Sequence, residues 1–249
     1  MYPILFTIGG VNLYSFGLSV AVGFLISSFL LLKECRRKGV DANPILDLAL
    51  GSFTSALIGA RLLYVFLHQG WYRTHPLEIF QVQRGGLIAY GGILLGIFFS
   101  IVFLRLKRIS FWETADVLIP FGVLTQAFGR IGCFLNGCCY GKPSSLFGIH
   151  PTQLYESFGL FLLFAGLRYA DRWRLKPGRP PVRRDEPRLR AGRLFSLYLV
   201  GYGLLRFGVE FLRGDQAPFL ISLTLAKWMS LASLAAGVWN WIWINTSFK

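Results

Sequence analysis

Seven long apolar segments constrain what this chain can fold into, because each is long enough to cross a lipid bilayer. A membrane-spanning helix needs about 20 mostly apolar residues. Only 15% of the 249 residues are charged, whereas soluble domains usually carry about 25%. The sequence therefore predicts an all-α, polytopic membrane protein with a single transmembrane domain over residues 1–249. We place its seven transmembrane helices at residues 11–32, 45–68, 85–104, 111–135, 151–169, 194–212 and 219–244.

The basic residues are concentrated in alternate connections between these segments. They lie between spans one and two, three and four, and five and six, where residues 171–192 form a basic, proline-containing loop. Because cytoplasmic loops carry an excess of Lys and Arg, we expect the N-terminus outside and the C-terminus and the 171–192 loop in the cytoplasm. The net charge of +14 then reflects topology and contact with the anionic lipid bilayer, and no nucleic acid partner is expected.

Polar and ionisable residues interrupt several of the apolar segments. Such residues are costly inside a membrane and usually face a cavity or a partner. Arg206 and Glu210 are four residues apart, so they share one face of a helix and are able to pair. Structural ion pairing is one explanation of this pattern, and a polar pocket that opens outward is the other. The residues concerned are Arg61, Arg130, Tyr202, Arg206, Glu210 and Arg213.

The segment GRIGCFLNGCCYG, residues 129–141, combines Arg130 with four glycines, an asparagine and three cysteines. The planar guanidinium of arginine donates two hydrogen bonds at once to a phosphate, so Arg130 and Arg206 predict a clamp for the phosphodiester of an anionic lipid. Glycines such as Gly129 allow a headgroup to approach the backbone. Tyr90, in RGGLIAYGG, is either a further polar contact or an interfacial aromatic anchor.

His150 and the three clustered cysteines admit several interpretations. His150 is a candidate general base or a brace for its loop. Cys133, Cys138 and Cys139 are either small packing residues or reactive groups. A disulfide from Cys133 to Cys138 or Cys139, a zinc site with His150 that needs a fourth ligand and a nucleophilic thiol are the reactive alternatives.

Five motifs together resemble the bacterial prolipoprotein diacylglyceryl transferases in order and spacing. They are GARLLYV, RGGLIAYGG, GRIGCFLNGCCYG, HPTQLYES and GYGLLRFGVEFLR. The resemblance implies transfer of the diacylglyceryl group of phosphatidylglycerol to the lipobox cysteine of a prolipoprotein, with formation of a thioether and release of glycerol phosphate. It implies no metal and no soluble cofactor. It also implies a place in the bacterial inner membrane, with the active site open toward the periplasm.

The resemblance and the residue patterns together give the candidate site. The predicted catalytic residues are Tyr90, Asn136, Tyr202, Arg206 and Glu210, and the predicted substrate-binding residues are Arg61, Gly129, Arg130, Gly141 and Arg213. The chain departs from the family pattern at Phe16, Tyr90, Cys133 and Cys138, where the family usually has tyrosine, histidine, asparagine and glutamate. These departures leave two alternatives: transfer of a lipid group to another acceptor, and a lipid-binding or transport protein without chemistry.

Overall fold

A computed structural model describes residues 2–8, 11–81, 85–145, 148–174, 191–214 and 223–246. The chain forms two compact units. The first contains Met1–Glu34 and Trp112–Lys249, and the second contains Cys35–Phe111. The 171–192 loop that we predicted lies largely outside the described residues.

Each predicted apolar segment overlaps a long helix, so these seven helices are confirmed as elements, although the start of the 219–244 segment lies outside the described residues. Among the residues that the structure describes, α1, α2, α4 and α5 are long and apolar enough to cross a membrane. The prediction that all seven helices span the bilayer stays a prediction. The helices are α1 (Ser15–Lys38), α2 (Ala42–Leu67), α4 (Ala89–Lys107), α5 (Phe111–Asn136), α6 (Thr152–Arg174), α7 (Arg193–Glu210) and α8 (Leu225–Thr246).

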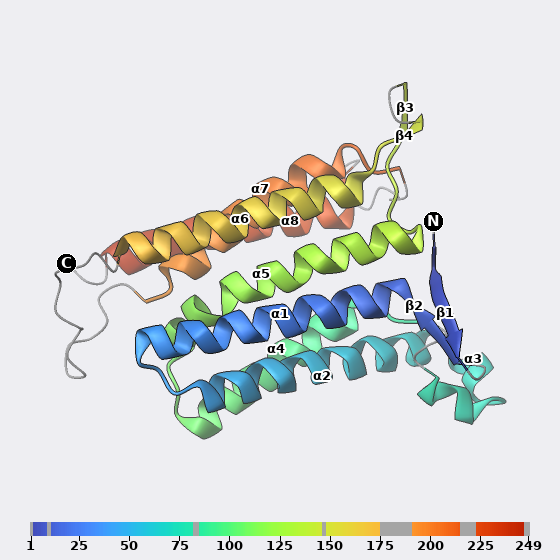
Figure 1. The fold of residues 1–249 in the computed structure, drawn as a ribbon, viewed down its shortest axis with the longest axis horizontal. Coiled ribbons are helices and arrows are strands. Elements are labelled where there is room, and N and C mark those ends of the chain that lie inside the picture. Colours follow the sequence, from blue (N-terminus) through green and yellow to red (C-terminus); the bar gives the residue numbers. More distant parts are fainter. Residues whose placement is uncertain are drawn as a thin grey trace. The chain divides into compact units, whose positions relative to one another are not determined.

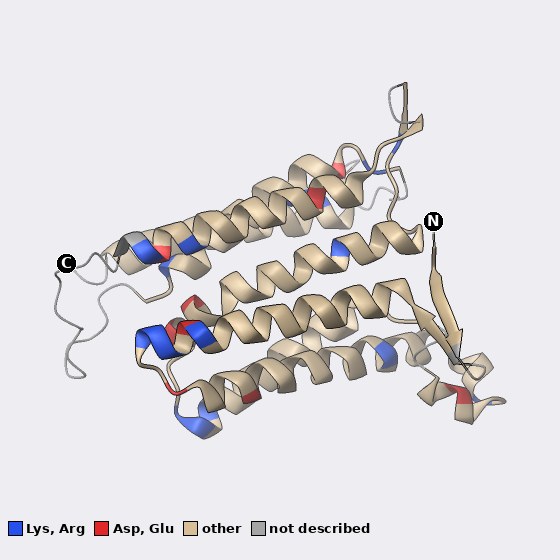
Figure 2. Cartoon of the chain, viewed as in Figure 1, with Lys and Arg blue, Asp and Glu red and all other residues tan. Residues whose placement is uncertain are grey.

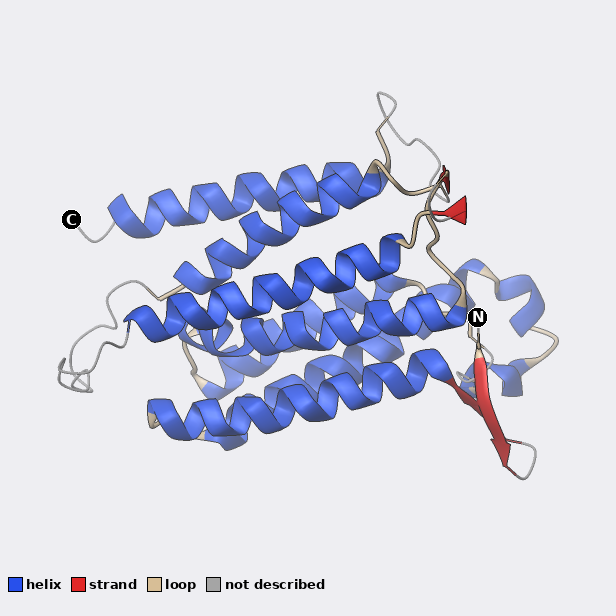
Figure 3. Ribbon diagram, turned by 45° about the horizontal axis from the view of Figure 1, so that its top comes forward, coloured by secondary structure: helices blue, strands red, loops and turns tan. Residues whose placement is uncertain are grey.

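The all-α prediction is incomplete, because the chain begins with a β-hairpin (Figure 3). Strands β1 (Ile4–Ile8) and β2 (Val11–Tyr14) pair antiparallel, so the first helix begins at Ser15 and not at Val11. The segment VNLY is rich in residues that favour strands, and the Ser15 N–H donates to the Pro3 carbonyl at 3.0 Å. Two short strands, β3 (Pro143–Ser144) and β4 (Gly148–Ile149), form a second antiparallel pair after α5.

Helices α5, α6 and α7 share the core of the first unit. Its centre consists of apolar side chains that are almost fully buried: Val123, Ala127, Leu160, Leu167 and Leu194. Helices α6, α7 and α8 lie side by side (Figure 1). A methyl group added at Gly203 of α7 would lie 2.9 Å from the Ser230 carbonyl oxygen of α8. Small residues permit such close helix contacts in membrane proteins.

Charged residues organise the end of the first unit where α6 finishes and α7 begins (Figure 2). The Asp116 carboxylate of α5 accepts hydrogen bonds from the backbone N–H groups of Gly192 at 2.9 Å and Phe195 at 3.0 Å. It therefore caps the N-terminus of α7 from a neighbouring helix. At the same end, Arg168 of α6 pairs with Glu34 of α1 at 2.6 Å.

The second unit is built on the pair α2 and α4, with the short helix α3 (Gln69–Tyr72) and the 3-10 helix η1 (Pro76–Phe80) between them. A methyl group added at Gly59 of α2 would lie 2.4 Å from the Gly91 carbonyl oxygen of α4. The two backbones therefore touch at this point, and only glycine fits on either side.

Candidate functional site

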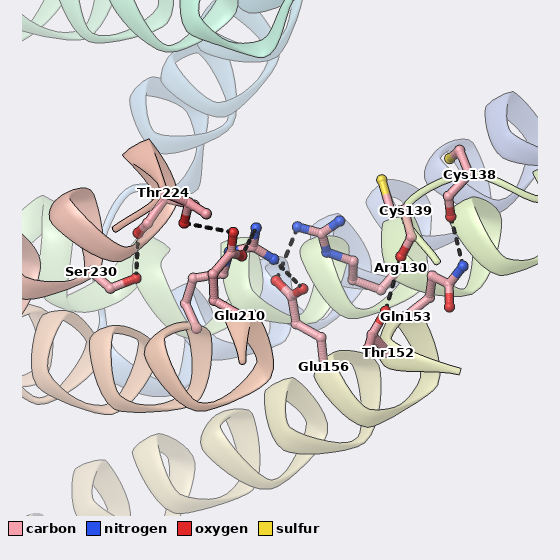
Figure 4. Close-up of polar contacts among 11 residues, drawn as sticks. Arg130, Cys138, Cys139, Thr152, Gln153, Glu156, Glu210, Thr224 and Ser230 are labelled. Atoms are coloured by element: carbon pink, nitrogen blue, oxygen red, sulfur yellow. Dashed lines mark hydrogen bonds and ion pairs between the residues drawn. The ribbon is translucent and has the colours of Figure 1, made fainter. Parts of the chain in front are cut away.

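A buried carboxylate, Glu156 of α6, lies at the centre of the polar residues in the first unit. Its side chain is 2% exposed. Arg130 of α5 contacts one carboxylate oxygen through Nη2 at 3.0 Å, and Arg206 of α7 contacts the other through Nη1 at 2.9 Å. Three helices thus each contribute one charged group to a single cluster (Figure 4).

The cluster continues from Arg206 toward α8. Arg206 Nη2 lies 2.7 Å from Oε2 of Glu210. The hydroxyl of Thr224, just before α8, donates to the other oxygen of Glu210 at 2.8 Å. Burial weakens solvent screening, so these contacts are stronger than on a surface, although each ion also loses its hydration.

The two arginines are not equivalent within this cluster. Both terminal nitrogens of Arg206 face carboxylates, whereas the contact with Glu156 uses one terminal nitrogen of Arg130. The Arg130 side chain is 19% exposed, against 10% for Arg206. Arg130 is therefore the better placed of the two to meet a ligand. Tyr202 of α7 lies beside the same charges and hydrogen-bonds with Gln126 of α5.

The sequence predicted that Arg130 and Arg206 would lie together, and the structure brings them together around a residue that we had not selected. Glu156 lies in the HPTQLYES motif, within a predicted span. The rule that marks ionisable residues inside spans as functional candidates applies to it as well. That signal was present in the sequence.

Gly141 lies where the loop after α5 passes between two other backbone segments. Its N–H donates to the His150 carbonyl at 3.1 Å, and it forms a β-bridge with Arg213. A methyl group here would lie 2.6 Å from the His150 oxygen, so glycine is required for packing. At Gly129, by contrast, the nearest atom to an added methyl is a Val20 carbon at 3.8 Å.

The three cysteines gather where α5 ends. Cys133 lies in the last turns of the helix, and the exposed Asn136 at its end hydrogen-bonds with Cys138. The sulfur atoms of Cys133, Cys138 and Cys139 all lie within 4.8 Å of one another. A hydrogen bond with Cys133 and the charges of Arg213 and Arg130 lower the pKa of Cys139 to about 5. Burial raises the pKa of Cys138.

Two predicted site residues, Arg61 and Tyr90, belong to the second unit. Arg61 donates to the backbone carbonyls of Glu78 and Ile79 in η1 and of Gly85 and Gly86 before α4, at 2.5–3.1 Å, so it connects η1 to the residues that precede α4. Tyr90 lies in the first turn of α4 and is 42% exposed. Their roles toward a substrate stay predictions.

Four of the described helices, long and apolar enough to cross a membrane, together with a buried chain of arginines and carboxylates within the first unit, define a membrane protein with an internal polar site. Residues 3–243 match the model of the family described as prolipoprotein diacylglyceryl transferase. The chain is 32% identical to the phosphatidylglycerol–prolipoprotein diacylglyceryl transferase of Clostridium tetani, with 96% of each chain covered. It is 34% identical to the enzyme of that name from Synechococcus elongatus, with 97% of this chain and 87% of the relative covered. The chain belongs to the prolipoprotein diacylglyceryl transferase family.

Proposed function

We propose that this protein transfers the diacylglyceryl group of phosphatidylglycerol to the cysteine of a prolipoprotein. The acceptor sulfur forms a bond to the glyceryl carbon, and the bond from that carbon to the phosphate oxygen breaks. The thiol proton passes to solvent, and glycerol phosphate departs with the electron pair of the broken bond. Family membership over residues 3–243, together with the Arg130–Glu156–Arg206 cluster, supports this proposal.

In this reaction Arg130 contacts the phosphate, and Arg206 positions the group that holds Arg130. Negative charge grows on the phosphate oxygen as the carbon–oxygen bond breaks, so a fixed guanidinium lowers the barrier. Arg130 is partly exposed and keeps donor capacity beyond its contact with Glu156. Arg206 is held between Glu156 and Glu210. Its contribution is to fix the Glu156 carboxylate, which in turn orients Arg130.

The direct test is a transfer assay with purified protein, phosphatidylglycerol and a lipobox peptide in detergent. We expect Arg130→Ala to lower the transfer rate by about 100-fold or more, the size of effect seen when one charge-stabilising donor is removed. Arg105→Ala, at an exposed arginine in the last turn of α4, is the matched control and should retain the wild-type rate. Wild-type transfer by Arg130→Ala would exclude the assigned role of this arginine.

The same assay addresses the second candidate function, transfer to an acceptor other than a lipobox cysteine. Cys133, Cys138 and Tyr90 replace residues that the family usually has, and this favours a different acceptor. If the wild-type protein consumes labelled phosphatidylglycerol but leaves the peptide unlabelled, the acceptor assignment is wrong. Restoration of growth in cells depleted of their own transferase would support the first candidate.

We further propose that all seven long helices span the bacterial inner membrane, with the N-terminus outside and the C-terminus in the cytoplasm. The basic connections in the sequence support this orientation. So does the position of the Arg130 cluster near the end of α5 that is remote from Arg168 and Arg193. In this orientation the candidate site opens toward the periplasm, where prolipoprotein substrates emerge.

A further inference from the structure

Three cysteines form a compact sulfur cluster at the C-terminal end of α5. Gly137, with φ of 78°, reverses the chain after the helix, and the Cys138 N–H donates to the Cys133 carbonyl at 3.2 Å. This turn brings two loop cysteines onto a helix cysteine. All three sulfur atoms lie within 4.8 Å of one another, and all three cysteines are free.

The loop that carries Cys138 and Cys139 is held firmly by α6. The buried Gln153 side chain donates to the Cys138 carbonyl at 2.6 Å, and the buried Thr152 hydroxyl donates to the Cys139 carbonyl at 2.9 Å. In Figure 4 both carbonyls face these side chains, and both sulfurs point away from them. The loop is therefore preorganised to present its thiols on one side.

The backbone of Cys139 is itself unusual. Its φ of 62° lies in the left-handed region, which residues with a side chain rarely adopt and where glycine is the ordinary choice. The hydrogen bond from Thr152 holds this conformation. A cysteine kept in such a position places its sulfur beside the other two, which is what a shared ligand would require.

The cluster dimensions and the surrounding charges suit a metal ion bound by thiolates. Zinc–sulfur bonds of about 2.3 Å place tetrahedral ligand sulfurs about 3.8 Å apart, so the cluster needs to contract by about 1 Å at most. Three thiolates with one divalent ion carry a net charge of −1. The charges of Arg213 and Arg130, which act on Cys139, are of the sign that balances such a complex.

We propose that Cys133, Cys138 and Cys139 form a three-thiolate site for a soft, thiophilic metal ion, Zn²⁺ or Cu⁺. Thiolates select these ions over hard cations such as Mg²⁺ and Ca²⁺. Three protein ligands leave the fourth position of a tetrahedral ion open to water or an external thiolate. A disulfide needs two sulfurs and gives the third no role. Among the described residues, His150 is not part of this ligand group; its ring lies 3.4 Å from the Tyr155 hydroxyl.

The test uses the purified, reduced full-length protein in detergent, first stripped of metal by a chelator. It is titrated separately with Zn²⁺ and with Cu⁺ against competing chelators, and with Co²⁺ as a spectroscopic probe. We expect one ion per chain and a thiolate-to-cobalt charge-transfer band. The metal content of the protein as purified, measured before the chelator is added, distinguishes the two ions, because relative affinity alone does not set which ion a thiolate site holds.

Serine substitutions test the three ligands one at a time, and Cys35→Ser is the matched control. Cys133→Ser, Cys138→Ser and Cys139→Ser should each weaken binding by about 100-fold or more, because loss of a ligand exceeds the 10–100-fold cost of disturbing its supporting groups. Cys35→Ser should bind the metal normally, because Cys35 is remote from the cluster. Ser19 of α1 hydrogen-bonds to Phe128 of α5, which is close to Cys133, and Cys35 lies about 24 Å further along α1 than Ser19. Binding that survives all three cluster substitutions would overturn the proposal.

A second measurement uses only the wild-type protein, so it does not depend on whether the variants fold. Saturating metal should protect Cys133, Cys138 and Cys139 of the wild-type protein from alkylation, as located by peptide mass mapping. Metal-independent alkylation of all three would contradict the site. Isolation of the protein with a disulfide among them, and no metal binding after reduction, would establish the disulfide interpretation instead.

Discussion

Glu156 connects the two arginines on which the proposed chemistry depends. Its carboxylate contacts Arg130 at 3.0 Å and Arg206 at 2.9 Å. Loss of one partner from a buried ion pair leaves the other charge uncompensated, which costs about 3–5 kcal/mol. The partial exposure of Arg130 reduces the cost on its side. The function of Glu156 is therefore to fix the position and orientation of both guanidinium groups.

We accordingly predict that Glu156→Gln lowers the transfer rate at least 10-fold and lowers the free energy of unfolding by a few kcal/mol. The amide keeps the shape of the side chain but not its charge. The transfer assay and thermal unfolding in detergent measure the two effects. Asp47→Asn, which neutralises an exposed carboxylate in α2, is the control. Wild-type rate and stability in Glu156→Gln would show that the ion pairs are dispensable.

Two glycines of the same motif should respond differently to alanine. At Gly141 the added methyl would lie 2.6 Å from the His150 carbonyl oxygen and 2.8 Å from the Leu212 carbonyl oxygen. At Gly129 the nearest atom is a Val20 carbon at 3.8 Å, which is an ordinary van der Waals contact. We predict that Gly141→Ala displaces the loop after α5 and lowers both stability and activity. Gly129→Ala should fold normally. If Gly129→Ala folds but loses lipid transfer, this result supports close approach of a lipid headgroup to the backbone at Gly129.

The site residues also show which features of the site the sequence alone predicts. Arg130, Arg206 and Glu210 were predictable because charged residues stand out against apolar segments. The proximity of Tyr202 to Arg206 followed from their spacing of four residues in one helix. The pairing with Glu156 was not predictable, because it depends on the way α6 packs between α5 and α7. The sequence likewise did not reveal that Arg61 is occupied by four backbone carbonyls.

At the level of elements, Asp116 illustrates a contact that links two helices far apart in the sequence. Its carboxylate accepts from the backbone N–H groups of Gly192 and Phe195 at the start of α7. The first N–H groups of a helix have no partner within the helix, and a negative charge there also interacts favourably with the helix dipole. Asp116 thus fixes where α7 begins relative to α5.

Asp116→Ala should destabilise the protein by about 1–2 kcal/mol, the usual cost of losing an N-terminal cap. Thermal unfolding in detergent would register this as a lower melting temperature. Asp116→Asn keeps one acceptor oxygen and should fall between the wild-type protein and Asp116→Ala. Equal melting temperatures for all three proteins would show that the cap adds nothing to stability.

The existence of the helices was predictable from sequence, and their ends were not. Apolar length fixes a span to within a few residues, but hydropathy does not distinguish the strand VNLY from the helix that follows it. Strands β1 and β2 pair from Ile4–Tyr14 to Ile8–Val11, and only Gly9 and Gly10 separate them in the sequence. Two glycines between two such runs are a local signal for a hairpin, which hydropathy does not register. The C-terminal boundary of α5 was close to the prediction because Gly137, with φ of 78°, ends the helix by local geometry.

At the scale of the whole molecule, the first unit carries Tyr2 and Asn245, which lie near the two termini in sequence, at opposite ends of its helices. The Tyr2 N–H donates to the Leu135 carbonyl at 2.9 Å, next to the end of α5. At the other end, Asn245 near the end of α8 accepts a hydrogen bond from Arg193 at the start of α7. Figure 1 marks both termini. An odd number of spans would produce this separation.

The charge pattern assigns a side of the membrane to each end, and fusions to reporter proteins test that assignment. Alkaline phosphatase, which is active only outside the cytoplasm, should be active when fused after Ser144 and inactive when fused after Arg108. A fluorescent protein that matures in the cytoplasm should fluoresce when fused after Lys249. Because α5 lies between Arg108 and Ser144, the two phosphatase fusions must differ if α5 spans the membrane. The reverse pattern at all three positions would invert the orientation and place the Arg130 cluster and the three cysteines on the cytoplasmic side, where an emerging prolipoprotein would not meet them.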